Sequence, residues 1–265
     1  MTDYQQLCMQ ACDTAKQAGA FIRHEACTFS PQKVEVKGEH NFVSYVDKGA
    51  EQMIVEQLRG ILPEAGFITE EGTASDRKAR FNWVIDPLDG TTNFIHGLPP
   101  YAVSIGLLED NVPVVGVVYE ISLNECFYAW KGGGAYLNGV PISVSARCSV
   151  NDSLIATGFP YYDYHLMRPY IDCLEYFLQH SHGVRRLGSA ATDLSYVACG
   201  RFEAFYEYSL SSWDVVGGVC ILQEAGGKVS DFSGGGNYIF GKEIVASNHL
   251  VFNEFLKIVQ TYLKK

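Results

Sequence analysis

Apolar residues recur every three or four positions through residues 3–27, which predicts an amphipathic helix near the start of the sequence. The same spacing returns over residues 45–59 and predicts a second helix, with Gly60 as its C-terminal cap. The intervening residues 30–44 are polar and rich in turn-forming residues, so we expect turns there. This part of the chain therefore predicts two helices joined by a polar connection.

Short apolar runs separated by turn signals follow over residues 101–145. The longest of these runs cover residues 102–108, 112–121 and 125–130. The Asn and Gly residues between them are typical of tight turns between neighbouring strands. We therefore predict an antiparallel meander rather than a βαβ series.

Two shorter strands are predicted before the meander, at residues 67–69 and 83–85. The second is expected to end at Asp86, because Pro87 has no N–H group and cannot extend a central strand. The next residues, 89–93, combine turn-forming and helix-starting side chains. The strand is therefore expected to deliver two carboxylates, two hydroxyls and a flexible glycine to one edge.

From about residue 150 the predicted strands and helices alternate. The strands are expected at 153–157, 202–208, 228–230 and 243–246, and the helices at 163–179, 189–198, 213–226 and 248–263. Such alternation predicts an α/β unit. We expect an α/β (α+β) fold with two subdomains. Residues 1–148 form the meander sheet and its helices, and residues 149–265 form a smaller α/β unit that completes the functional site.

The composition restricts the function classes. The 265-residue chain carries a formal net charge of −10, whereas nucleic-acid binders normally present a basic surface, so we predict no nucleic-acid partner. No apolar run reaches the ~20 residues that span a bilayer, so no membrane association is expected. The eight cysteines form no CxxC pair, which indicates reduced thiols in a cytoplasmic protein.

Acidic residues stand where predicted strands end or helices begin, at Glu70, at Asp86 with Asp89, and at Asp214. Carboxylate-rich sites select hard cations such as Mg²⁺, and the absence of a His or Cys cluster from the sequence disfavours zinc. Two such ions ~4 Å apart would bridge a phosphate and generate a nucleophile from water. Each carboxylate could instead cap a helix or turn, and position alone leaves both interpretations open.

Four segments resemble motifs of the inositol monophosphatase family, in the family's order and over nearly the whole chain. They are Thr69-Glu70-Glu71-Gly72, Asp86-Pro87-Leu88-Asp89-Gly90-Thr91-Thr92-Asn93-Phe94, Gly188-Ser189-Ala190-Ala191-Thr192-Asp193-Leu194, and Trp213-Asp214 with the later Glu224-Ala225-Gly226-Gly227. The resemblance implies a layered αβαβα sandwich that assembles as a homodimer. It also implies Mg²⁺-dependent hydrolysis of phosphomonoesters and sensitivity to lithium.

The resemblance also assigns roles to individual residues. The ligands of two or three Mg²⁺ ions would be Glu70, Asp86, the Leu88 carbonyl, Asp89 and Asp214. Thr91 paired with Asp47 would orient the attacking water, and these two with Glu70 form the expected catalytic set. The residues expected to bind substrate are Gly90 and Thr91 at the phosphate, Gly188, Ser189 and Ala190 along the polyol pocket, Glu207 at a hydroxyl group, and Asp214.

The favoured interpretation is hydrolysis of inositol 1-phosphate, or a similar cyclitol or sugar monophosphate, by metal-activated water. Thr69 and Gly72 depart from the Gly and Ser that many family members carry, which leaves Glu70 in place but can alter its loop. Alternatives that share the site are a fructose-1,6-bisphosphatase, a 3′(2′),5′-bisphosphate nucleotidase and a histidinol phosphatase. Arg185 and Arg186 would suit a second phosphate, although a surface role is favoured. A regulatory or assembly partner without turnover is the non-enzymatic alternative.

Overall fold

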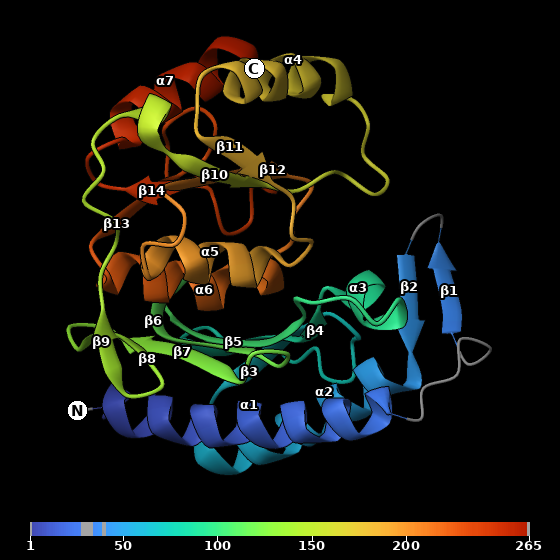
Figure 1. Ribbon diagram of the computed structural model, residues 1–265. Coiled ribbons are helices and arrows are strands. Elements are labelled where there is room, and N and C mark those ends of the chain that lie inside the picture. The colour runs from blue at the N-terminus through green and yellow to red at the C-terminus, as the bar shows by residue number, and fades with distance from the viewer. Residues whose placement is uncertain (1, 28–33, 39–40, 264–265) are drawn as a thin grey trace.

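Helices and sheets stack in five alternating layers, as Figure 1 shows. The structure is a computed structural model that describes residues 2–27, 34–38 and 41–263. The outer helices are α1 (Tyr4–Ala26) and α2 (Tyr45–Ile61) on one side and α4 (Met167–Gln179) and α7 (Phe252–Leu263) on the other. Between the two sheets lie α5 (Ala190–Ala198) and α6 (Ser212–Glu224). The predicted αβαβα sandwich is confirmed.

The first sheet has seven strands that pair in chain order. They are β3 (Gly66–Thr69), β4 (Phe81–Asp89), β5 (Ala102–Glu109), β6 (Val112–Glu120), β7 (Glu125–Trp130), β8 (Gly134–Leu137) and β9 (Val140–Ile142). From β4 onward every pairing is antiparallel, as the meander predicts, whereas β3 runs parallel to β4. The ends of β3 and β4 therefore meet at one edge, next to Glu70 and Asp86.

The second sheet comes from the later part of the chain, in the order β11-β10-β12-β14-β13. Its strands are β10 (Leu154–Thr157), β11 (Gly183–Arg185), β12 (Ala204–Tyr208), β13 (Gly227–Ser230) and β14 (Glu243–Asn248). β10 is parallel to both of its neighbours, and β14 is antiparallel to β12 and β13. The two sheets thus arise from separate parts of the sequence, and the subdomain boundary at residue 148 stays a prediction.

Helix α6 packs very close to the first sheet because glycines line the contact. A Cβ added to Gly106 would lie 2.3 Å from Val216 Cγ1, and one added to Gly116 would lie 2.3 Å from the Gly217 carbonyl oxygen. Such distances are far below van der Waals contact, so larger side chains would push the helix away from the sheet. The close packing brings the first turn of α6, with Asp214, down to the strand ends.

Strand β4 differs from the prediction, because it continues through Pro87 to Asp89. The strand pairs Asp86 with Ser104 and Asp89 with Ala102, so its register shifts between these two positions. Such a bulge leaves residues without ladder partners, and a proline there loses no hydrogen bond. The prediction that the strand ends at Asp86 is therefore wrong.

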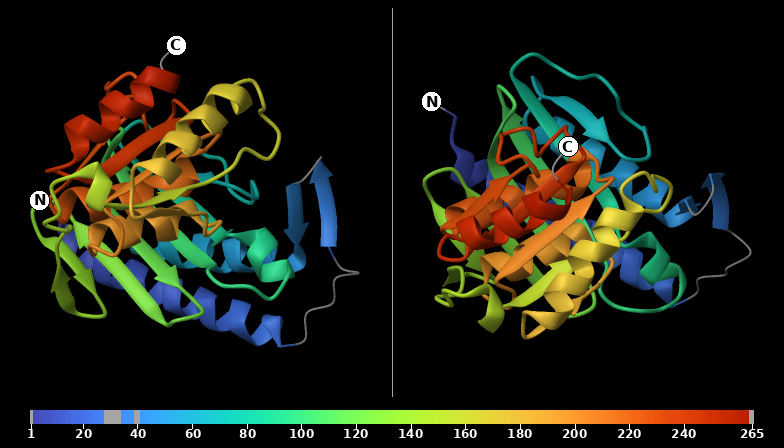
Figure 2. Two further views of the ribbon diagram at one scale, coloured as in Figure 1. Left: turned by 45° about the horizontal axis from the view of Figure 1, so that its top comes forward. Right: turned by 90° about the horizontal axis from the view of Figure 1, so that it is seen from above.

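Other boundaries also differ. Strands β1 (Val34–Gly38) and β2 (Asn41–Ser44) form a hairpin where turns are predicted, and it stands at one end of the molecule (Figures 1 and 2). Helix α2 continues past Gly60 to Ile61, and α4 begins at Met167 rather than at residue 163. Helix α7 begins only at Phe252, because Asn248 ends β14 and its side chain accepts hydrogen bonds from the next turn.

Within the described residues, no helix combines the length and apolar character needed to cross a membrane. The cytoplasmic location expected from the sequence stays a prediction.

Candidate active site

The bulged end of β4 supplies two of the acidic side chains. The Leu88 N–H donates a 2.9 Å hydrogen bond to Asp86 Oδ1, which ties the bulge to the first carboxylate. Gly90 follows with a φ of 92°, and a Cβ there would lie 3.0 Å from the Pro100 carbonyl oxygen. Only glycine adopts this conformation without strain, so Gly90 allows the chain to turn directly from Asp89 into α3 (Thr91–Ile95).

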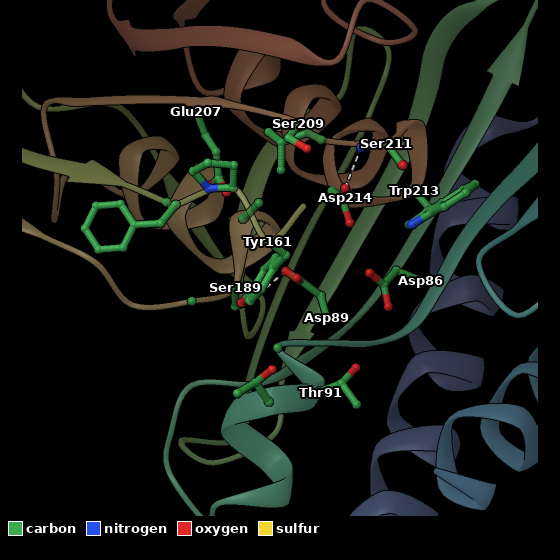
Figure 3. Close-up of a pocket in the computed structure, with 18 of the residues that line it drawn as sticks. Asp86, Asp89, Thr91, Tyr161, Ser189, Glu207, Ser209, Ser211, Trp213 and Asp214 are labelled. Atoms are coloured by element: carbon green, nitrogen blue, oxygen red, sulfur yellow. Dashed lines mark hydrogen bonds between the residues drawn. The ribbon is translucent and has the colours of Figure 1, made fainter. Parts of the chain in front are cut away.

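Asp214 reaches the same place from the first turn of α6. Its Oδ2 accepts a 2.6 Å hydrogen bond from the Ser211 N–H, so it also caps its helix. Asp86, Asp89 and Asp214 each offer one oxygen, and these three atoms lie within 4.8 Å of one another (Figure 3). The structure thus brings together three predicted metal ligands from two sequence-distant segments.

Glu70 lies beside this three-carboxylate group rather than within it. It follows β3, and its N–H donates a 3.3 Å hydrogen bond to the Ile85 carbonyl oxygen. Its carboxyl group is close enough to Asp86 and Asp214 for their charges to affect its pKa. The Leu88 carbonyl oxygen, the remaining predicted ligand, accepts a hydrogen bond from Thr91 at 3.0 Å.

Thr91 and Asp47, the predicted water-orienting pair, are in contact. Thr91 Oγ1 lies 3.1 Å from Asp47 Oδ1, and Asp47 projects from α2 with only 1% of its surface exposed. Thr91 itself lines the pocket that the three carboxylates border. The Thr91 hydroxyl donates its one proton to a single acceptor at a time. Its oxygen also has lone pairs, which can accept a hydrogen bond from a water.

The pocket brings the remaining predicted substrate residues to the acidic group. Gly90, Gly188, Ser189, Ala190 and Glu207 all line it. The Glu207 carboxylate lies against the backbone of Gly158, where an added Cβ would be only 2.0 Å from its Cδ. Among the lining residues that the structure describes, Arg186 is the single cation.

Helix α5 holds one of the carboxylates in a way that the sequence did not indicate. Asp89 Oδ2 accepts a 2.6 Å hydrogen bond from the Ser189 hydroxyl and a 2.8 Å bond from the Ala191 N–H. Ser189 caps α5 as well, accepting from the Thr192 N–H at 3.3 Å. Ser189 was predicted only to line the pocket, and its cap position was the sole sequence signal for this contact.

Two further residues with structural roles at the site were given no role from the sequence. The Asn93 amide donates to the Pro100 and Leu187 carbonyl oxygens, both at 2.8 Å, and thereby ties α3 to the segment before Gly188. Glu51, one helical turn after Asp47, accepts three hydrogen bonds from residues 71 and 73. Its i, i+4 spacing from Asp47 on a predicted helix was the available signal.

Burial raises the pKa of each of these carboxyl groups, and the charges of neighbouring carboxylates raise the pKa of Glu70, Asp86 and Asp214 further. Burial raises the pKa of Asp89 to about 6, against the hydrogen bond from Ser189, and raises the pKa of Asp214 to about 7 with the help of the nearby Asp89 charge. The pKa values of Glu70 and Asp86 lie well above their usual range for the same two reasons. Crowded carboxyls of this kind hold protons that a cation can displace.

The donor set fits a hard divalent cation. The described cluster offers carboxylate and carbonyl oxygens without His or Cys, which suits Mg²⁺ and not zinc. The sequence profile of the Inositol monophosphatase family matches residues 3–264.

The chain belongs to the inositol monophosphatase family.

Named relatives within this family are similar over nearly their whole length. The chain is 37% identical over 247 residues to an inositol-1-monophosphatase of Mesorhizobium japonicum, with 93% of each chain covered. It is 41% identical over 250 residues to a putative Nus factor SuhB of Neisseria meningitidis serogroup B, covering 94% of this chain and 96% of the relative. The solved inositol monophosphatase from Anabaena superposes with a TM-score of 0.86 at 34% identity, covering 98% of each chain. The family resemblance seen in the sequence is confirmed, and the relatives carry two kinds of name.

Proposed function

We propose that this member of the family is a Mg²⁺-dependent phosphomonoesterase for inositol 1-phosphate or a similar cyclitol or sugar monophosphate. The observation that carries the proposal is the meeting of Asp86, Asp89 and Asp214 beside the Thr91–Asp47 contact. A metal site and a means of orienting water are the two requirements of metal-assisted phosphate hydrolysis. The three carboxylates and Thr91 line one pocket, and Glu207 lines the same pocket.

Two or three Mg²⁺ ions are proposed, held by Glu70, Asp86, the Leu88 carbonyl, Asp89 and Asp214. When bound, Mg²⁺ supplies positive charge that stabilises a phosphate and makes water a better nucleophile. Asp86, Asp89 and Asp214 fit this role because one carboxylate oxygen from each lies within 4.8 Å of the other two. A bound cation would displace the protons that these carboxyl groups hold.

The other residues position water and substrate. Thr91 accepts a hydrogen bond from the attacking water while it donates to Asp47, whose buried carboxylate favours this orientation. The Gly90 and Thr91 N–H groups hold the phosphate. Glu207 accepts a hydrogen bond from a substrate hydroxyl, and Gly188, Ser189 and Ala190 form the adjoining wall, all of them lining the pocket.

The direct test is phosphate release from inositol 1-phosphate with and without Mg²⁺. We expect activity to require the metal and to fall by more than about 100-fold in Asp89→Asn, since loss of a residue that merely supports a ligand costs about 10–100-fold. Asp152→Asn is the matched control, because Asp152 is exposed and does not line the pocket. Full activity of Asp89→Asn, or of the enzyme in excess chelator, contradicts the proposal.

The bisphosphate alternatives depend on Arg186. Its guanidinium lies 5.7 Å from the ring centres of both Phe159 and Tyr161 and donates to the Tyr161 hydroxyl at 2.9 Å. A second substrate phosphate would have this single pocket cation as its partner. A panel of inositol 1-phosphate, fructose 1,6-bisphosphate and adenosine 3′,5′-bisphosphate, run with wild type and Arg186→Met, separates these options. Selective loss of bisphosphate turnover in the variant favours the alternative.

The observation in support of the non-enzymatic alternative is that several relatives are named Nus factors. Purified protein that neither binds Mg²⁺ nor releases phosphate from the panel would support that function instead. Lithium inhibition and a homodimer belong to the proposal as family expectations, and both are measured on the same preparation by inhibition curves and light scattering.

A further inference from the structure

Glu51 is a fully buried carboxylate whose oxygens accept hydrogen bonds from one short segment. It lies on α2 with 0% of its surface exposed. Glu51 Oε2 accepts the Glu71 N–H at 2.7 Å, and Oε1 accepts the Thr73 N–H at 2.8 Å and the Thr73 hydroxyl at 2.7 Å. A buried carboxylate is unfavourable without such partners, so the arrangement specifies the path of residues 71–73.

Glu70 directly precedes this segment. The Glu70 N–H is bonded to the Ile85 carbonyl oxygen, and the very next N–H, that of Glu71, is bonded to Glu51. Glu70 is thus held between a contact to β4 on one side and a contact to α2 on the other. Gly72, with a φ of 73°, lets the chain turn between the two N–H groups that Glu51 receives.

Glu51 and Asp47 occupy the same face of α2, one turn apart. Asp47 contacts Thr91 at the water-orienting position, and Glu51 contacts the segment that follows the metal-ligand candidate Glu70. One helix therefore supports both parts of the site from behind. Neither Glu51 nor the residues it binds, 71 and 73, line the pocket.

We propose that Glu51 is a positioning residue that sets the metal affinity of the site by holding Glu70 in place. The inference rests on the proposed Mg²⁺-dependent function. In Glu51→Gln one oxygen still accepts, but the new amide NH₂ faces N–H or O–H donors and cannot accept from them. The segment loses at least one charge-assisted hydrogen bond, and Glu70 loses its second anchor.

The first test needs no metal. Hydrogen–deuterium exchange on metal-free protein should show the amides of residues 71–73 exchanging about tenfold faster in Glu51→Gln, since charge-assisted bonds are worth more than neutral ones. Ile54→Val is the matched control, because Ile54 is buried on the same helix and apolar. Equal exchange of this segment in wild type and Glu51→Gln overturns the proposal. Equal acceleration in Ile54→Val also overturns it, since the effect would then be general loosening of α2.

The second test measures Mg²⁺ directly. Calorimetric titration should show affinity weakened by about 10–100-fold in Glu51→Gln, the range for residues that support a metal ligand. The maximal rate at saturating Mg²⁺ should recover to within about twofold, because Glu51 touches neither substrate nor water, and Glu51→Asp should restore part of the affinity. If wild type binds Mg²⁺ and Asp89→Asn does not, an unchanged Mg²⁺ affinity in Glu51→Gln refutes the positioning role but not the proposed function. If wild type itself binds no Mg²⁺, the proposed function fails, and the metal-free exchange experiment still decides whether Glu51 holds the segment.

Discussion

The Ser189 hydroxyl lies 2.6 Å from Asp89 Oδ2, although the two residues are 100 positions apart in the chain. One belongs to the cap of α5 and the other to the end of β4. The orientation of Asp89 is therefore set by a helix from the other part of the sequence. The group of Asp86, Asp89 and Asp214 forms only when the layer containing α5 and α6 packs on the first sheet.

Ser189→Ala should weaken Mg²⁺ binding by about tenfold, because a supporting hydrogen bond to Asp89, a proposed metal ligand, is lost. The Ala191 N–H still holds the same oxygen at 2.8 Å, so binding should not vanish. Calorimetric titration measures the change. Thr192→Val is the control, since Thr192 contacts the Ser189 hydroxyl at 2.7 Å but not Asp89. An equal loss in both variants would mean that the contact between the Ser189 and Thr192 hydroxyls, rather than the bond to Asp89, matters, because Thr192→Val keeps the N–H that caps α5.

Asp214→Asn should separate the two roles of this side chain. The amide oxygen can still accept the Ser211 N–H, now 2.6 Å from Oδ2, so the helix cap survives. The metal-free variant should therefore keep its Tm or gain stability near neutral pH, where a buried like charge is removed. Activity should fall by more than about 100-fold. A large drop in the Tm of the metal-free variant would show that capping is the dominant role.

The stability of the metal-free protein should fall as pH rises toward neutrality. The folded-state pKa values of Asp89 and Asp214 are raised to about 6 and about 7, whereas an unfolded Asp titrates near 3.9. Between these values the folded state binds more protons than the unfolded state, so the free energy of unfolding decreases with pH. The stabilisation is complete below about pH 4 and is lost as pH rises through about 7.

Urea unfolding in chelator at about pH 5.5 and about pH 7.5 measures this decrease, which should be smaller in Asp214→Asn. Mg²⁺ should bind more tightly at the higher pH, because fewer protons must leave. Calorimetric titrations in buffers of different ionisation enthalpy measure how many protons are released when Mg²⁺ binds. A Mg²⁺ affinity that is the same at both pH values would contradict the shared-proton description of the cluster.

Local sequence patterns correctly predicted the helices and strands whose conformation does not depend on tertiary contacts. The meander was predictable because Asp110, Asn111 and Asn138 take left-handed conformations at its turns, which Asn and Asp tolerate well. The positions of the grouped carboxylates at strand and helix ends made them candidates, and the family resemblance assigned them as metal ligands. The path of β4 through Pro87 was not predictable, because it depends on pairing with β5 across a bulge.

Supporting contacts of polar residues could not be predicted from the sequence either, whether or not the residue had been given a role. Glu51 and Ser189 reach their partners only through the packing of α2 and α5 against strand ends. A Glu or a Ser at these positions can equally be solvated or cap a helix, so the residue type alone does not indicate a supporting hydrogen bond. Which polar residues make supporting contacts depends on the distances between sequence-distant segments, and the layered packing sets those distances.

Gly90→Ala should destabilise the fold by about 1–3 kcal/mol, because its left-handed conformation is strained for alanine and the added Cβ would press on backbone oxygen. The Cβ would lie 3.0 Å from the Pro100 oxygen and 3.2 Å from the Gly188 oxygen, neither of which can move alone. Gly139→Ala is the control, since its φ of 86° is similar and the described atoms leave open space around it. Thermal unfolding should show the larger drop for Gly90→Ala, and equal drops would mean that conformation alone accounts for the cost.

Gly158→Ala should impair substrate binding without a comparable loss of stability. The added Cβ would lie 2.0 Å from Glu207 Cδ, and the flexible end of that side chain can move away. Glu207 would then leave the position from which we propose that it accepts a hydrogen bond from a substrate hydroxyl. We expect KM for inositol 1-phosphate to rise about tenfold, as for one hydrogen bond to a charged group, with a smaller change in kcat and in Tm. The double variant Gly158→Ala with Glu207→Ala should bind substrate no more weakly than Glu207→Ala alone, because both changes remove the same contact. Additive losses in KM would show that Gly158 acts on the pocket independently of Glu207.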